Sequence, residues 1–167
     1  MGKAEFVYVT YIATTPEKLW EALTQGKFTK QYWFGRQIES DWRIGSPVRF
    51  YDGDSNDLTD SGVVLEYDPP FRLAYTFRNE FDSEAQKLGY SRVAFSIERR
   101  DETVKLTLVH DELLNEELAA AFREGWSPIL SSLKTYLETG KPLLIRAKVV
   151  EQESTKQVNR VRQAIKK

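Results

Sequence analysis

The chain has 167 residues, of which 41% are hydrophobic and 29% are charged, so we expect one soluble, packed domain rather than a disordered chain. It contains no cysteine and one histidine, which excludes disulfides, zinc–thiolate sites, thiol nucleophiles and a multi-histidine metal site within one chain. The net charge is −1, but residues 141–167 carry eight basic and two acidic side chains, so a basic tail follows a mildly acidic body.

The N-terminal segment predicts one strand and two short helices. Residues 5–14 alternate between two sets of bulky side chains, which is typical of a strand that packs on both faces. A helix is expected next, because Thr15 fits an N-cap and Pro16 fits the first helical position. A second short helix is expected from Lys27 to Trp33.

The middle of the chain predicts about six short strands separated by turn residues. Residues 45–47 read Gly-Ser-Pro and mark a hairpin-like turn. Alternating apolar residues then return at 71–78, 91–98 and 103–112. Because these last strands are joined by short links, we expect them to pair antiparallel.

The longest predicted helix begins after Asn115, a favourable N-cap, and ends before Gly140, which suits a helix C-terminus. Its apolar residues recur at helical spacing. Gly125 and Pro128 lie inside it, although both residue types weaken a helix interior. We expect a bend near Glu124, with Gly125 leaving room for the close approach of the sheet or a ligand.

This order of elements indicates an α+β fold, in which only the last helix is long enough to cover the apolar face of an antiparallel sheet. Four stretches carry a family resemblance: "IATTPEKLWEALT", "YWFG" through "SDWRIGSPVRF", "GVVLEYDPPFRLAYTF" and "EGWSPILSSLKTYLETGKP". The chain resembles the helix-grip SRPBCC superfamily, which includes START lipid-transfer domains and the birch-pollen allergens. The motifs are similar to one branch, the proteins that resemble the C-terminal domain of the activator of the 90-kDa heat-shock chaperone ATPase.

The resemblance implies a curved antiparallel sheet of about six or seven strands wrapped on a long C-terminal helix, with two short helices after the first strand. We expect this helix-grip domain over residues 1–140. A basic extension, helical or partly disordered, is expected over residues 141–167, of which residues 143–167 have no counterpart in the family.

The resemblance also implies a function. Family members look like binders of a hydrophobic or amphipathic small molecule, held in a cavity between the sheet and the last helix. We expect such binding, without enzymatic activity, in this chain. The alternative is a protein-interaction module associated with a chaperone, because eukaryotic members act on that chaperone. An enzyme of unknown reaction is the third hypothesis, in which a tyrosine, Glu66 or His110 supplies acid–base chemistry.

Aromatic and polar side chains on the inward faces of these elements are the candidates for lining the cavity. The alternative for each of them is ordinary core packing. The orientation of Glu66 stays open, because strand periodicity does not decide which face it joins. His110 is either a ligand contact or a structural histidine bonded to backbone. The predicted cavity-lining residues are Tyr8, Thr10, Trp33, Trp42, Phe50, Tyr75, Phe77, Phe95, His110, Phe122, Trp126 and Ile129.

Neither a catalytic set nor a metal or cofactor site is expected. Residues 52–63 resemble a calcium loop, but Asp57 stands where glycine is required and Val63 where a bidentate glutamate is required. We therefore expect a solvated hairpin loop there. His110 is the only histidine available as a catalytic base, and no nucleophile motif accompanies it.

The tail offers a possible partner surface. Val158, Val161 and Ile165 recur at helical spacing, which predicts a basic amphipathic helix over residues 155–167 or a frayed tail. Such a helix would dock on the acidic body, pair with another chain or contact an anionic partner. The basic residues of this face are Lys156, Arg160, Arg162 and Lys166.

Other partners are not expected. Basic residues of the body are scattered, so no nucleic-acid site is predicted there. No apolar run approaches the roughly 20 residues that span a bilayer, and the N-terminus lacks the apolar core of a signal peptide. We therefore expect a cytoplasmic protein. Residues 143–150 are apolar enough to pack on the body or to add an edge strand.

Overall fold

The structure is a computed structural model that describes residues 3–81, 83–145 and 159–166. It contains one antiparallel sheet of seven strands in the order β1-β7-β6-β5-β4-β3-β2. The elements in chain order are β1 (Ala4–Ile12), α1 (Pro16–Thr24), α2 (Gly26–Tyr32), β2 (Arg36–Ser40), β3 (Pro47–Asp52), β4 (Leu58–Asp68), β5 (Arg72–Asn79), α3 (Ser83–Gln86), β6 (Ser91–Arg100), β7 (Thr103–Leu113) and α4 (Glu116–Thr139). A further helix covers residues 159–165.

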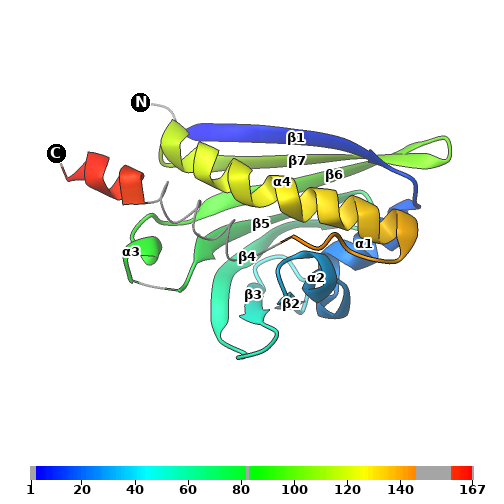
Figure 1. Ribbon diagram of the computed structural model, residues 1–167, viewed down its shortest axis with the longest axis horizontal. Helices are drawn as coiled ribbons and strands as arrows, with labels where there is room; N and C mark the ends of the chain where they lie inside the picture. Colours follow the sequence, from blue (N-terminus) through cyan, green and yellow to red (C-terminus); the bar gives the residue numbers. More distant parts are fainter. Residues whose placement is uncertain (1–2, 82, 146–158, 167) are drawn as a thin grey trace.

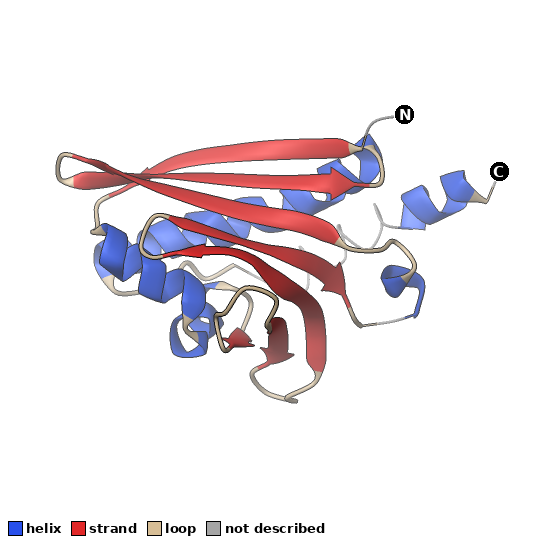
Figure 2. Cartoon of the chain, turned by 180° about the vertical axis from the view of Figure 1, so that it is seen from behind, coloured by secondary structure: helices blue, strands red, loops and turns tan. Residues whose placement is uncertain are grey.

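The sheet curves around α4, which lies along one of its faces (Figure 1). Strands β2 to β7 pair with their sequence neighbours, whereas β1 returns to pair with β7. Helix α4 contacts β1 and β7, and it also contacts α1 and α2, which follow the first strand. Figure 2, seen from the opposite side, shows the sheet in front of α4. The predicted helix-grip fold is therefore confirmed.

The helix ends follow the residues that predicted them. The Thr15 hydroxyl accepts the N–H of Lys18 at 3.2 Å, and Pro16 opens α1. The Asn115 side chain accepts the N–H of Leu118 at 2.9 Å at the start of α4. Gly140 ends α4 with a φ of 84°, which glycine adopts at no steric cost. Helix α2 is shifted by one residue from its prediction, and α3 was not predicted.

A bulge in β4 resolves the orientation of Glu66. The register shifts between Val64, which faces inward, and Glu66. As a result Glu66 lies at the surface, where it forms an ion pair with Arg72 at 2.7 Å. Tyr67 turns instead to pack against the core. The extra residue breaks the two-residue period, so periodicity alone did not decide the question.

Helix α4 runs without interruption through Pro128. A Cβ placed on Gly125 would meet no heavy atom within 4 Å. The expectation that the sheet approaches Gly125 closely is therefore wrong, because this face of the helix looks onto open space. The predicted bend near Glu124 stays a prediction.

Candidate functional site

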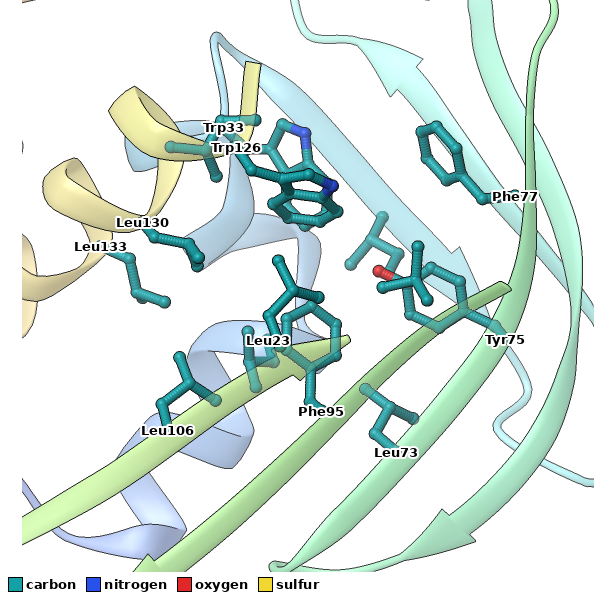
Figure 3. Packing of buried hydrophobic residues seen from close by; sticks show 14 of the residues in the cluster. Leu23, Trp33, Leu73, Tyr75, Phe77, Phe95, Leu106, Trp126, Leu130 and Leu133 are labelled. Carbon is teal, nitrogen blue, oxygen red and sulfur yellow. The ribbon is translucent and has the colours of Figure 1, made fainter. Parts of the chain in front are cut away.

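A continuous group of aromatic rings fills the space between α4 and the sheet (Figure 3). The rings come from five strands, from α4 and from the residue after α2. Neighbouring ring centroids lie 4.5 to 6.2 Å apart, which is the usual range for packed aromatic pairs. We call this group the aromatic cluster; its members are Phe6, Trp33, Phe50, Tyr75, Phe77, Phe95, His110, Phe122 and Trp126.

Most of the predicted cavity-lining residues belong to this cluster, because strand alternation and helical spacing both identify inward faces. Ile129 is buried on α4 one turn further on, and Tyr8 and Thr10 lie partly exposed on the inward side of β1. Phe6 was missed, although it shares the face of Tyr8 and Thr10 on the same strand. Side-chain parity alone would have included Phe6.

Trp42 lies apart from the aromatic cluster. Its ring stacks on Tyr67 with the centroids 6.0 Å apart. Its Nε1 donates to the carbonyl oxygen of Thr24 at 3.1 Å. Within the described residues, no ring contact joins Trp42 to the cluster. Its contacts fasten the segment after β2 to the end of α1.

His110 joins α4 to the sheet through a chain of hydrogen bonds. Trp126 Nε1 donates to His110 Nδ1 at 2.9 Å, since an indole nitrogen is only a donor. The proton of the neutral imidazole is therefore on Nε2, which donates to Ser91 Oγ at 2.7 Å. The Ser91 hydroxyl in turn donates to the carbonyl oxygen of Phe77 at 3.2 Å.

These partners leave no polar atom of the His110 ring unsatisfied. Burial lowers the pKa of His110 to about 3, so the ring is neutral near pH 7. A neutral imidazole with both nitrogens occupied has no free base to offer a substrate. The contacts are those of a structural histidine, although its partners are side chains rather than the backbone.

Tyr75 presents the opposite case within the same cluster. Its side chain is 0% exposed, and its hydroxyl has no hydrogen-bond partner in the described part of the chain. Figure 3 shows the oxygen pointing from β5 into the space between the sheet and the two tryptophans. Burial raises the pKa of Tyr75 well above its usual value, so the hydroxyl keeps its proton and is available as a donor.

Two other buried polar side chains of the described interior, those of Tyr32 and Asp60, have partners. The Tyr32 hydroxyl donates to the carbonyl oxygen of Ala22 at 2.6 Å. The buried carboxyl of Asp60 accepts from Asn79 Nδ2 at 2.6 Å and from Thr59 Oγ1 at 2.8 Å. The Thr14 hydroxyl also lacks a partner, but it lies in the turn between β1 and α1, outside the cluster. Tyr75 thus carries the unsatisfied donor of the aromatic cluster.

We call the space between the concave face of the sheet and α4 the grip. One end of the grip is less tightly filled. A cavity of about 10 Å³, room for roughly one water molecule, lies between the start of α4, α3 and the ends of β5 and β7. Phe77 and Phe122 of the aromatic cluster line it, so the cluster reaches this end of the molecule. The lining also includes Ala85, Leu88, Leu113 and Leu118.

No group of three or more potential metal-ligating side chains is present among the described residues. In the loop between β3 and β4, Asp52 Oδ1 accepts the backbone N–H groups of Asp54 at 2.9 Å and Ser55 at 3.0 Å. This carboxylate therefore closes a local turn, as expected for a solvated hairpin loop. In the parts of the chain that are described, no helix has the length and apolar character needed to cross a membrane.

The curved sheet closed on one long helix defines a helix-grip protein of the SRPBCC class. A family model described as activator of Hsp90 ATPase homolog 1-like protein matches residues 13–138, and the chain belongs to this family. No curated protein matches the chain.

Several solved structures share the fold. CalU16 from Micromonospora echinospora is 16% identical, with a TM-score of 0.67 over 94% of this chain and 85% of its own. The Aha1 dimer from Colwellia psychrerythraea is 19% identical, with a TM-score of 0.66 over 83% of this chain and 98% of its own. An HSP90 activator from Plasmodium falciparum is 19% identical, with a TM-score of 0.54 over 65% of this chain and 73% of its own. At these identities the likeness extends to the fold alone.

Proposed function

We propose that the protein binds an apolar or amphipathic small molecule between the sheet and α4, without catalysing a reaction. The observation that carries this proposal is the buried hydroxyl of Tyr75 inside the aromatic cluster, which has no partner among the residues that the structure describes. A buried donor without a partner costs about 1–3 kcal/mol, and a bound acceptor would offset that cost. The expected ligand therefore has an apolar body and one neutral acceptor, such as a carbonyl oxygen.

The filled interior sets the route of binding. Rings of the aromatic cluster occupy the space that the ligand would take, so some of them must move aside. Phe122 is half-buried and lines the small cavity together with Phe77, which makes this end the least tightly packed part of the cluster. The ligand would enter there and reach Tyr75 by displacing these two rings.

The absence of catalysis is proposed on the arrangement of the titratable groups. His110 has both ring nitrogens engaged, and Glu66 is turned to the surface by the bulge in β4. Glu66 and His110 are the two individual residues that the sequence suggests for acid–base chemistry. Neither is placed to transfer a proton to a molecule inside the grip.

A titration of the purified full chain with Nile red, a neutral apolar dye with a carbonyl acceptor, tests the proposal. Tyr75→Phe should weaken binding by about fivefold to tenfold, the equivalent of one hydrogen bond. Tyr32→Phe is the matched control, because its hydroxyl already bonds to Ala22 and it should bind the dye as the wild type does. Equal affinity of the wild type and Tyr75→Phe, or no saturable binding, overturns the proposal. Native mass spectrometry after exposure to a lipid extract then identifies the natural ligand class.

The outer face of β1 favours a second function, binding of a protein partner related to the chaperone system. Val7, Val9 and Tyr11 are 56%, 49% and 52% exposed on this edge strand. Contiguous exposed apolar side chains mark protein contacts in many soluble proteins. The family description fits a chaperone as that partner. We propose a cytoplasmic location, in which the two proteins would meet.

Capture of a purified 90-kDa heat-shock chaperone by the immobilised full chain tests this second function. The double variant Val9→Lys and Tyr11→Lys should lose most of the captured chaperone. Both substituted side chains, Val9 and Tyr11, are exposed, so the core should stay intact in the variant. A wild type that captures no chaperone removes this second function.

A further inference from the structure

The chain reverses direction after α4. Gly140 ends the helix, and the backbone N–H of Leu143 then donates to Ser132 Oγ at 3.2 Å, which places residues 141–145 back alongside α4. The helix of residues 159–165 lies at the other end, beside α3 and the start of α4, in both views of the molecule (Figures 1 and 2). The C-terminal segment thus reaches the end of the grip where the small cavity is found.

The helix of residues 159–165 is docked through one apolar residue. Val161 is 0% exposed and belongs to the hydrophobic core, whereas Ile165 on the same helix is 56% exposed. Among the described residues of this helix, Val161 alone is buried. The predicted basic amphipathic helix is therefore present in its described part, while residues 155–158 and 167 lie outside the described residues.

Charge complementarity adds an electrostatic attraction to this docking. The pKa of Glu84 on α3 is lowered first by its hydrogen bond from Lys87 and further by the charges of Lys166 and Arg162. The basic face of the tail helix therefore lies close to α3. Attraction between exposed charges of this kind weakens with ionic strength.

The surface under this helix belongs to the same end of the grip as the cavity. Ala85 and Leu88, from α3 and its following turn, and Leu118 and Phe122, from α4, line the cavity. The helix of residues 159–165 lies beside the same two elements (Figure 1). A residue covering this end therefore covers the place where the aromatic cluster comes nearest to the surface. Val161 is the buried residue of the helix that lies at this end.

We propose that the surface between α3 and the start of α4 is a binding surface for a short basic amphipathic helix, occupied here by the chain's own residues 159–165, which act as a displaceable cap over the ligand entrance. A helix of this length is unstable on its own and needs the surface to stay folded. With one buried anchor and screened charges, it exchanges readily. The gating of a ligand rests on the proposed function, whereas the helix-binding surface does not.

Two full-chain variants on the same helix test the docking. Val161→Glu places a charge at the buried anchor and should release the helix, because a charge buried without a partner is strongly unfavourable. Ile165→Glu makes the same chemical change at an exposed position and should leave the helix docked. Hydrogen–deuterium exchange of the amides of residues 162–165 should be about tenfold faster in Val161→Glu than in the control, which corresponds to 1.4 kcal/mol. Equal exchange in the two variants overturns the cap.

A labelled synthetic peptide of residues 155–167 tests the surface itself. It should bind the Val161→Glu protein at least about tenfold more tightly than the wild type, whose surface is already occupied. The same peptide carrying Val161→Glu should not bind. Failure of the unmodified peptide to bind the released protein overturns the helix-binding surface.

The rate at which Nile red associates tests the gating role of the tail helix separately from the proposed ligand binding. The dye should associate faster with Val161→Glu than with Ile165→Glu, and the added peptide should reverse this gain. Equal association with the two variants overturns the gating role of the helix. If no variant binds Nile red, the proposed function fails, and the peptide titration still decides whether the surface binds a helix.

Discussion

His110 and Tyr75 are two buried polar groups of one aromatic cluster, and they differ in their partners. His110 accepts from Trp126 and donates to Ser91, so both of its nitrogens are used. The hydroxyl of Tyr75 has no partner in the described part of the chain. Burial is equal in the two cases, at 0% exposure, and therefore does not distinguish a structural residue from a candidate ligand contact.

The difference has an energetic meaning. A satisfied buried network fixes the geometry of a core, because every member resists displacement. An unsatisfied donor lowers the stability of the empty protein and leaves a specific place for an acceptor. The His110 region thus fastens α4 to the sheet, and the Tyr75 region stays ready to contact another molecule.

Removal of the Trp126 ring gives the largest expected effect. Trp126→Ala should lower the free energy of unfolding by about 4 kcal/mol, because it empties a buried site and leaves His110 Nδ1 without its donor. Denaturant unfolding monitored by circular dichroism measures the loss. Trp42→Ala is the control, since Trp42 is half-buried outside the cluster and should cost clearly less. Equal losses would mean that the cluster does not fasten α4 more firmly than any other aromatic contact.

The next largest effect is expected in the folding stability below neutral pH, which should depend on the protonation of His110. Its pKa in the folded protein is about 3, and an unfolded histidine titrates near 6.5. The unfolded chain therefore binds a proton between these values that the folded protein does not, so stability falls as the pH falls below about 6.5.

A comparison of the wild type with His110→Gln isolates this proton. The slope for one such group is about 1.4 kcal/mol per pH unit. The stability gap between the two proteins should therefore narrow by about 2 kcal/mol from pH 7 to pH 5. Denaturant unfolding of both proteins at pH 7 and pH 5 measures this change in the stability gap. Both pH values lie above the range in which carboxylates with lowered pKa values titrate. Parallel pH profiles would contradict the buried, neutral state of His110.

A smaller effect of opposite sign is expected at Tyr75. Tyr75→Phe should raise the free energy of unfolding of the ligand-free protein by about 1 kcal/mol, because it removes an unsatisfied buried donor. Tyr32→Phe should lower it by a similar amount, since that hydroxyl bonds to Ala22. Thermal unfolding of the two variants side by side gives the signs. A destabilised Tyr75→Phe would show that the hydroxyl has a partner and would erase the contrast with His110.

Much of the fold was predictable from local patterns. Alternation in β6 and β7 and helical spacing in α4 identified the inward faces, and Thr15, Asn115 and Gly140 marked helix ends correctly. Helix α3 has four residues, which is too short to leave a periodic pattern. Trp42 lies beyond the end of β2 with a φ of 53°, so strand alternation did not reach it.

The partners of the buried polar groups were not predictable from such patterns. Ser91 and Trp126 lie 19 and 16 positions away from His110. They meet it because β6 and β7 pair in one particular register and because α4 is rotated to present its indole. These are tertiary facts, and no local spacing contains them. The lack of a partner for the Tyr75 hydroxyl among the described residues has the same origin.

Pro128 has a consequence for how α4 opens. Proline lacks an N–H, so the carbonyl of Glu124 loses its usual intrahelical donor. Trp126 lies within this weakened turn. Its hydrogen bond to His110 attaches the turn to β7. After it, Leu130 and Leu133 are 1% and 0% exposed. The turn around Glu124 is therefore where we expect the helical hydrogen bonds of α4 to be lost first during local unfolding.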